Sequence, residues 1–194
     1  LGIYDGGQYA KELLTGDIHT MNQKAAGLET RDQAKTFIYA FLYGAGDAKI
    51  GEIVGGSSRE GKNLKARFLA ALPALNKLRV DVEERVRRGG FLRGLDGRVL
   101  PIRSEHSALN TLLQSAGAVA MKQALILLYY KLTNLGWQHG REYAFVANIH
   151  DEFQAEVAPK YAEVYGQLAV EAIRAAGVNL KMRCPLDGEF KVGD

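Results

Sequence analysis

Four side chains suited to binding an anion and a flat ring recur every fourth residue in the first quarter of the chain. They are Arg31, Lys35, Tyr39 and Tyr43. On an α-helix each lies about 40° further round than the one before, so the four form one stripe beside an apolar face. Two cations one turn apart repel each other mildly, so their spacing does not serve helix stability. The stripe suits a nucleoside triphosphate, which carries its charge at one end and a stackable base at the other. A basic amphipathic helix with boundary tyrosines is the alternative.

Three adjacent polar residues, His150, Asp151 and Glu152, separate two apolar segments that have strand character. A carboxylate pair on a rigid hairpin can hold Mg²⁺, which prefers oxygen ligands. Two-metal nucleotidyl transfer also needs a carboxylate that bridges two ions about 3.5–4 Å apart. As three letters alone, the string is more typical of a solvated hairpin turn. A metal-dependent phosphohydrolase of the His-Asp type is a further hypothesis, but no second histidine cluster at ligand spacing supports it.

A third set of polar side chains, His106, Asn110 and Gln114, recurs at four-residue spacing in an otherwise apolar stretch. On a helix the three form one stripe. Asn and Gln carry donors that can reach the N3 and O2 acceptors of the DNA minor groove, which every correctly paired base pair presents. The stripe therefore suits a check of base-pair shape without a reading of sequence. Taken alone, an ordinary polar helix face is the simpler interpretation.

The elements that must position these side chains follow from caps, breakers and periodicity. Asp17 is expected to cap a helix that ends at Gly27. Thr30 to Gln33 forms a capping box for a helix that runs to about Tyr43. The other expected elements are helices at about 59–72, 73–88, 105–135 and 159–176, a hairpin at 91–103 that turns at Asp96-Gly97, strands at 143–149 and 153–157, and an edge strand within 181–191. The expected fold class is α+β, mostly helical.

The composition is that of an ordinary soluble protein, with 47% hydrophobic and 24% charged residues among 194. The net charge of +3 is unevenly distributed, because residues 59–103 hold twelve Lys and Arg but only five Asp and Glu. This basic block suits a polyanion such as nucleic acid. A solvated, arginine-rich helix face explains the block as well.

The sequence also bears on compartment and processing. Cys184 is the only cysteine, which predicts a reducing cytoplasm, and no N-terminal segment has the pattern of a signal peptide. The apolar stretch 112–132 is broken by Gln114, Lys122 and Gln123, so it predicts a long core helix and no membrane span. The first residue is Leu1, which predicts that the chain begins inside a longer reading frame or after processing.

The segment from Arg31 to Gly44, RDQAKTFIYAFLYG, resembles motif B of family A (bacterial polymerase I-like) DNA polymerases, the R-x3-K-x7-YG helix of the fingers. The resemblance implies that Arg31 and Lys35 hold the incoming triphosphate. It also implies that Tyr39 lies beside the sugar of the nucleotide and that Tyr43 stacks near the templating base. The preceding GDIHT at 16–20 resembles the branch found in podophages, in which the residue at His19 contacts phosphate.

The segment 148–153, NIHDEF, resembles motif C of the same polymerases. The resemblance implies that Asp151 is a metal-bridging carboxylate and that Glu152 is the acidic neighbour supporting the site. It also implies that His150 lies near the primer terminus.

The segment 109–118, LNTLLQSAGA, resembles the palm helix of the family, in which the residues at Asn110 and Gln114 contact the primer–template junction. His106 belongs to the same polar stripe. Arg103 lies just before this helix and is expected to touch a phosphate or the primer end.

The resemblance implies an organisation with a palm edge at 1–16, fingers at 17–104 and a palm half at 105–194 that carries the metal-binding hairpin. It implies two Mg²⁺ ions, and as partners primer–template DNA, dNTPs and an upstream polymerase portion. Motif A precedes Leu1 in this family, and Asp5 and Asp17 fall after that point, so the chain alone is expected to be inactive. The expected compartment is the cytoplasm, that of the host if a phage encodes the chain. A non-catalytic nucleic-acid-binding domain and a His-Asp nucleotide hydrolase are the alternatives.

Overall fold

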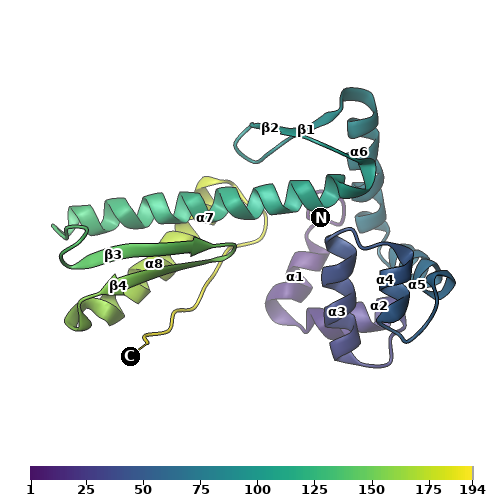
Figure 1. The fold of residues 1–194 in the computed structure, drawn as a ribbon, viewed down its shortest axis with the longest axis horizontal. Coiled ribbons are helices and arrows are strands. Elements are labelled where there is room, and N and C mark those ends of the chain that lie inside the picture. The colour runs from purple at the N-terminus through teal and green to yellow at the C-terminus, as the bar shows by residue number, and fades with distance from the viewer. Residues whose placement is uncertain (194) are drawn as a thin grey trace. The chain divides into compact units, whose positions relative to one another are not determined.

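The computed structural model describes residues 1–193, which divide into two compact units. The N-terminal unit is Leu1–Arg93 with Val99–Leu113, and the C-terminal unit is Gly94–Arg98 with Gln114–Asp194. In chain order the elements are α1 (Gln8–Thr15), α2 (Ile18–Ala26), α3 (Arg31–Leu42), α4 (Asp47–Glu52), α5 (Ser58–Ala71), α6 (Pro73–Gly89), β1 (Phe91–Arg93), β2 (Val99–Pro101), the 3₁₀ turn η1 (Glu105–Ser107), α7 (Ala108–Asn134), β3 (Tyr143–Ile149), β4 (Glu152–Val157), the 3₁₀ turn η2 (Pro159–Tyr161) and α8 (Ala162–Asn179) (Figure 1). The expected α+β, mostly helical class is confirmed.

The predicted caps of α2 and α3 are present. Asp17 accepts hydrogen bonds from the backbone of the first turn of α2, and Gly27 ends that helix with φ 63° in the left-handed region. Thr30 and Gln33 form the reciprocal capping box at the start of α3. These caps satisfy backbone donors that a helix start would otherwise leave without partners, which is why the sequence predicted both helix starts correctly.

An aromatic cluster holds the inner face of α3 in the core of the N-terminal unit. Phe37 is fully buried and meets Phe68 of α5 edge-to-face, with ring centroids 5.0 Å apart. Phe41 meets the same ring at 5.4 Å. Such edge-to-face pairs stabilise a core beyond simple area burial. The apolar side of α3 is therefore fixed, and its opposite side faces outward.

The short helix α4, which the sequence did not predict, lies against α5 at a point where both helices have glycine. A Cβ on Gly61 would overlap the carbonyl oxygen of Asp47 and would lie 2.6 Å from the backbone nitrogen of Gly51. A Cβ on Gly51 would overlap the carbonyl oxygen of Ser57. The two backbones can approach this closely only because neither position has a side chain.

The predicted hairpin at 91–103 is confirmed. Strands β1 and β2 pair in antiparallel fashion with Leu92 opposite Leu100. These two leucines pack with Val82 and Val86 of α6 and with Ala108 in a small core of the N-terminal unit.

In the C-terminal unit the antiparallel hairpin β3–β4 packs one face against α7 and α8 (Figure 1). Tyr143 pairs with Val157 at one end and Ile149 with Glu152 at the other, with a bulge between Phe145 and Ala147. The core of this unit is made by Leu128, Leu132, Tyr143, Phe145, Phe153, Ala155, Val157, Tyr165, Ala169 and Ala172.

The structure corrects two expectations about element boundaries and type. The α-helix predicted from Glu105 begins at Ala108, after the 3₁₀ turn η1. The edge strand predicted within 181–191 is wrong, because this segment forms no strand. It instead packs its side chains along α8, where Phe190 lies over Gly166 and Leu186 over Gly177.

The helical stretch Glu105–Asn134 is long and apolar enough to cross a membrane by length and composition alone. Within the unit, Leu128 and Leu132 have no exposed surface and belong to the core against β3, β4 and α8. This packing agrees with the predicted core helix.

Candidate functional site

The four predicted nucleotide-binding residues follow one another along the outer side of α3. We call Arg31, Lys35, Tyr39 and Tyr43 the α3 stripe. All four side chains are exposed, with Tyr39 at 49% and Tyr43 at 57% of their full surface. Lys35 makes no hydrogen bond or ion pair with any of residues 1–193, so its ammonium is available to an anion. A half-exposed tyrosine ring can stack on a flat partner at little cost in side-chain entropy.

Arg31 forms a bidentate ion pair with Asp17. Its Nε donates to Oδ2 at 2.7 Å, and its Nη2 donates to Oδ1 at 3.2 Å. The guanidinium and the first-turn donors of α2 hold the pKa of Asp17 far below its usual range, and the carboxylate in turn raises the pKa of Arg31. Both groups are therefore charged at neutral pH, and α2 and α3 are joined at their N-terminal ends.

His19 lies in the first turn of α2, beside this ion pair. Its backbone N–H donates to Asp17 Oδ1 at 3.0 Å, the oxygen that Arg31 Nη2 also contacts. The ring nitrogen Nδ1 is buried and has no hydrogen-bond partner within residues 1–193. The structure thus brings the backbone of His19 and the guanidinium of Arg31 to one carboxylate.

Lys65, which sequence reasoning did not single out, anchors the chain just beyond the C-terminal end of the α3 stripe. Its Nζ donates to the carbonyl oxygen of Ala45 at 2.6 Å and pairs with Asp47 Oδ1 at 2.9 Å. These contacts fix the turn that follows Tyr43 against α5. No sequence signal reveals a contact of this kind, because Lys65 and Ala45 are twenty residues apart and the whole of α4 lies between them.

The predicted turn at His150, Asp151 and Glu152 is a two-residue hairpin loop. Ile149 pairs with Glu152, so His150 and Asp151 form the loop itself, and His150 has φ 53° in the left-handed region. The side chains of all three polar residues are exposed. A positive φ at the first loop residue is typical of tight two-residue hairpins. Asp151 therefore lies at the tip of a tight hairpin, and the predicted turn between two strands is confirmed.

The chemistry of the hairpin tip fits a hard divalent cation in part. Asp151 and Glu152 are adjacent exposed carboxylates, and Glu152 Oε1 accepts a hydrogen bond from Gln154 Nε2 at 2.6 Å. Within residues 1–193 no group of three or more Asp, Glu, His or Cys side chains is placed to hold a metal ion. The hairpin therefore supplies one side of an oxygen-rich site and needs further ligands from elsewhere.

The polar residues predicted to contact DNA do not form a single stripe on one helix. Asn110 and Gln114 lie one turn apart on α7, whereas His106 lies in the 3₁₀ turn before it, whose three residues per turn break the four-residue spacing. Arg103 is exposed and makes no hydrogen bond or ion pair with the described part of the chain.

The basic block at 59–103 is partly paired within the protein, with six of its cations in ion pairs with acidic side chains. Seven of its twelve cations bind acids or carbonyl oxygens, namely Lys65, Arg67, Lys77, Arg79, Arg87, Arg88 and Arg98. Arg59, Lys62, Arg85 and Arg103 have no such contact among the residues described. Four of the six acidic partners, Asp81, Glu83, Glu84 and Asp96, belong to the block itself, so these ion pairs leave most of its excess positive charge in place.

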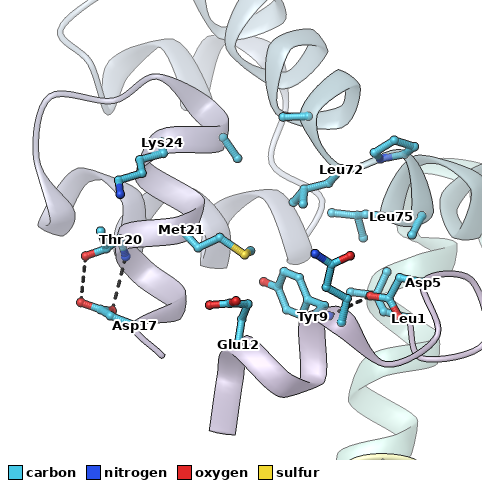
Figure 2. A pocket seen from close by; sticks show the side chains of 15 residues that line it. Leu1, Asp5, Tyr9, Glu12, Asp17, Thr20, Met21, Lys24, Leu72 and Leu75 are labelled. Atoms are coloured by element: carbon cyan, nitrogen blue, oxygen red, sulfur yellow. Dashed lines mark hydrogen bonds between the residues drawn. The ribbon is translucent and has the colours of Figure 1, made fainter. Parts of the chain in front are cut away.

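A cleft of about 700 Å³ opens in the N-terminal unit between α1, α2 and the junction of α5 with α6 (Figure 2). Met21, Leu72 and Leu75 contribute to its apolar wall. No residue of the α3 stripe lines it, so this cleft is not the predicted nucleotide site. Asp17 lines the cleft and also forms the ion pair with Arg31.

A family model for DNA polymerase family A matches residues 11–194. The chain belongs to DNA polymerase family A. This membership confirms the predicted family and gives no support to a separate hydrolase or a purely binding domain. The family A chain is 45% identical to the DNA-directed DNA polymerases of Enterobacteria phage T3 and Escherichia phage T7, over 98% of its own length. Both relatives are phage proteins, in agreement with the expected phage branch.

The chain spans 29% of the length of each of these two relatives. Among solved structures it is similar to the POL domain of Pol1 from M. smegmatis, a complex with DNA primer-template and dNTP. The TM-score is 0.76 at 20% identity, covering 96% of this chain and 35% of that one. This likeness confirms the polymerase fold.

Proposed function

We propose that this chain forms the nucleotide-binding helix and one carboxylate side of the metal site in a template-directed DNA polymerase. The observation that carries the proposal is the α3 stripe, which is exposed on a helix whose opposite face is fixed by Phe37 and Phe41 against Phe68. Family membership and the likeness to a polymerase domain solved with primer-template and dNTP support the same function.

In the proposed reaction the primer 3′-hydroxyl attacks the α-phosphorus of the dNTP. A new O–P bond forms, the bond to the bridging oxygen breaks, and pyrophosphate leaves. Lys35, Arg31 and His19 neutralise the charge on the β- and γ-phosphates, where negative charge grows as the bond breaks. Tyr39 lies against the sugar and Tyr43 against the templating base, so that α3 closes productively only around a well-shaped pair.

Asp151 and Glu152 are the residues of this chain that would hold the catalytic metal, for which Mg²⁺ is the proposed ion. When bound, such ions stabilise the charge on the attacking and leaving oxygens. The hairpin offers only one carboxylate side, so residues 1–194 alone should not extend a primer. Robust extension by the purified chain would contradict this part of the proposal.

The proposal is tested by Lys35→Ala in a complete polymerase that contains this chain. Loss of an unpaired ammonium that binds phosphate should lower kcat/KM for dNTP at least about tenfold, since a hydrogen bond to a charged group contributes roughly 1.5–3 kcal/mol. Single-nucleotide incorporation measures the effect.

The matched control is Lys62→Ala, which removes another lysine without an internal partner, from α5. It should leave nucleotide kinetics unchanged. Equal effects of the two substitutions, or none from Lys35→Ala, would remove Lys35 from the nucleotide site.

A further inference from the structure

One exposed carboxylate, that of Asp17, is shared between two helices of the proposed nucleotide site. Its Oδ1 accepts from the backbone N–H of His19 at 3.0 Å. Thr20 donates its backbone N–H to Oδ1 at 3.3 Å and its hydroxyl to Oδ2 at 2.8 Å (Figure 2). The same two oxygens receive Arg31 from α3. Asp17 therefore fixes the helix that carries His19 and, at the same time, the direction of the Arg31 guanidinium.

The geometry of the ion pair leaves half of the guanidinium available. Asp17 occupies the edge formed by Nε and Nη2. Nη1 has no partner within residues 1–193, so the edge formed by Nη1 and Nη2 remains open. Because guanidinium is planar with five donors in fixed directions, a carboxylate on one edge sets where the other edge points. An anion can bind that edge without displacing Asp17.

The ion pair contributes little to the stability of the fold. The side chains of Arg31 and Asp17 keep 51% and 44% of their exposed surface. Exposed pairs of this kind typically stabilise proteins by less than about 1 kcal/mol, because water and salt screen them. The main consequence of the contact is therefore the orientation of Arg31.

We propose that Asp17 is a positioning residue of the nucleotide site, holding the Arg31 guanidinium so that its open edge meets the polyphosphate of an incoming nucleotide beside His19. The inference rests on the proposed function, because it assumes that Arg31 binds the triphosphate. It goes further in giving a role to a carboxylate that would repel phosphate on its own. The negative charge of Asp17 is compatible with a phosphate site, because its carboxylate already accepts hydrogen bonds from Arg31 and from the backbone donors of α2.

The test is Asp17→Asn in a complete polymerase that contains this chain. Asn is as good an N-cap as Asp, so α2 should keep its start while the charge that orients Arg31 is lost. We expect KM for dNTP to rise about three- to tenfold with kcat nearly unchanged, which is less than the loss of a whole charge-assisted contact, because Arg31 remains but is no longer held in one direction. The melting temperature of the polymerase should not change.

Asp32→Asn is the matched control. Asp32 is the neighbouring exposed acid in the first turn of α3 and has no ion pair within residues 1–193, so its removal changes the local charge but not the contact. It should leave KM unchanged. Arg31→Ala should raise KM more than Asp17→Asn, and the double variant should match Arg31→Ala alone, because Asp17 acts through Arg31.

These variants distinguish the triphosphate-binding role of Arg31 from the positioning role of Asp17. If Arg31→Ala leaves KM for dNTP unchanged, the triphosphate role of Arg31 fails, and the role of Asp17 fails with it. If Arg31→Ala raises KM but Asp17→Asn does not, only the positioning role is overturned. A lower KM in Asp17→Asn would mean that Asp17 competes with the nucleotide, and additive effects in the double variant would mean a structural role. Either result overturns the inference.

Discussion

Arg31 and Lys35 present their positive charges in different ways, although they lie one turn apart on the same helix. Arg31 is held by Asp17, so its direction is set before any ligand arrives. Lys35 has no partner in the described chain and is free to follow the ligand. A fixed planar donor and a mobile point charge together suit a flexible polyphosphate, because one defines its position and the other adapts to it.

Tyr39 offers a test at the scale of one oxygen atom. A dideoxynucleotide lacks the 3′-hydroxyl and therefore loses the hydrogen bond that this group makes. If the ring of Tyr39 lies against the sugar, the tyrosine hydroxyl can make that hydrogen bond in its place. Tyr39→Phe should therefore increase discrimination against dideoxynucleotides at least about tenfold, the effect of one lost hydrogen bond near 1.5 kcal/mol. The ratio of kcat/KM for dNTP to that for ddNTP measures it.

Tyr130→Phe, at a tyrosine on α7 that is 59% exposed, serves as the control and should leave the ratio unchanged. An unaltered ratio in Tyr39→Phe would mean that Tyr39 does not lie at the sugar.

The α3 stripe could be predicted from the sequence, and the contacts that orient it could not. Helical periodicity alone places Arg31, Lys35 and Tyr39 on one side of a helix. The pair of Arg31 with Asp17 depends on how α2 packs against α3, and the bond from Lys65 to Ala45 depends on how α5 packs against the turn after α3. Contacts of this kind are set by tertiary packing, for which a single sequence carries no local signal.

At the scale of whole elements, the helices that were predicted are those with a local sequence signal, and those that were missed lack one. The starts of α2, α3 and α5 carry side-chain caps, so their starts could be read from the sequence. Helices α1 and α4 begin after glycines without a side-chain cap and were missed. The tail at 181–191 has alternating apolar residues, which favoured a strand, but its leucine and phenylalanine pack over glycines of α8 instead.

The glycine contact between α4 and α5 predicts a large effect from one methyl group. Gly61→Ala would force Asp47 and Gly51 away from α5, because the new Cβ overlaps backbone atoms that cannot rotate aside. We expect a loss of about 3 kcal/mol or more in the free energy of unfolding, at or above the usual range for overpacking. Urea unfolding followed by circular dichroism measures the change.

Gly89→Ala is the matched control in the same unit, because a Cβ there meets nothing closer than 3.6 Å. It should change the free energy of unfolding by less than about 1 kcal/mol. A stability of Gly61→Ala equal to that of the control would mean that α4 and α5 do not pack as described.

At the scale of the whole chain, seven acidic side chains within residues 1–193 form ion pairs with arginine. Arg31, Arg98, Arg87 and Arg174 lower the pKa of Asp17, Asp96, Glu105 and Asp187 respectively. In the unfolded chain these groups return to ordinary values of 3.8 for Asp and 4.5 for Glu. Each exposed pair therefore adds a small stabilisation, which is fully present above those values and is lost as the pH falls through the lower native pKa values.

This linkage predicts an acid-sensitive fold. The melting temperature of the chain should vary little between pH 7 and pH 5 and fall steadily below about pH 4.5, where the unfolded state begins to bind more protons than the native state. In about 1 M NaCl the fall should be shallower, because salt screens exposed pairs. Circular-dichroism melting across this range is the measurement, and a melting temperature that stays constant to pH 3 would contradict the expected pKa shifts.

We propose that the hairpin tip supplies a metal-binding carboxylate to the reaction whose nucleotide the α3 stripe binds. Single-turnover incorporation of one dNTP by a complete polymerase carrying Asp151→Asn tests it most directly, with Glu156→Gln on β4 of the same hairpin as the control. We predict that Asp151→Asn slows incorporation at least about a hundredfold while primer–template still binds, and that the control incorporates normally. Near-normal incorporation by Asp151→Asn would contradict the claim.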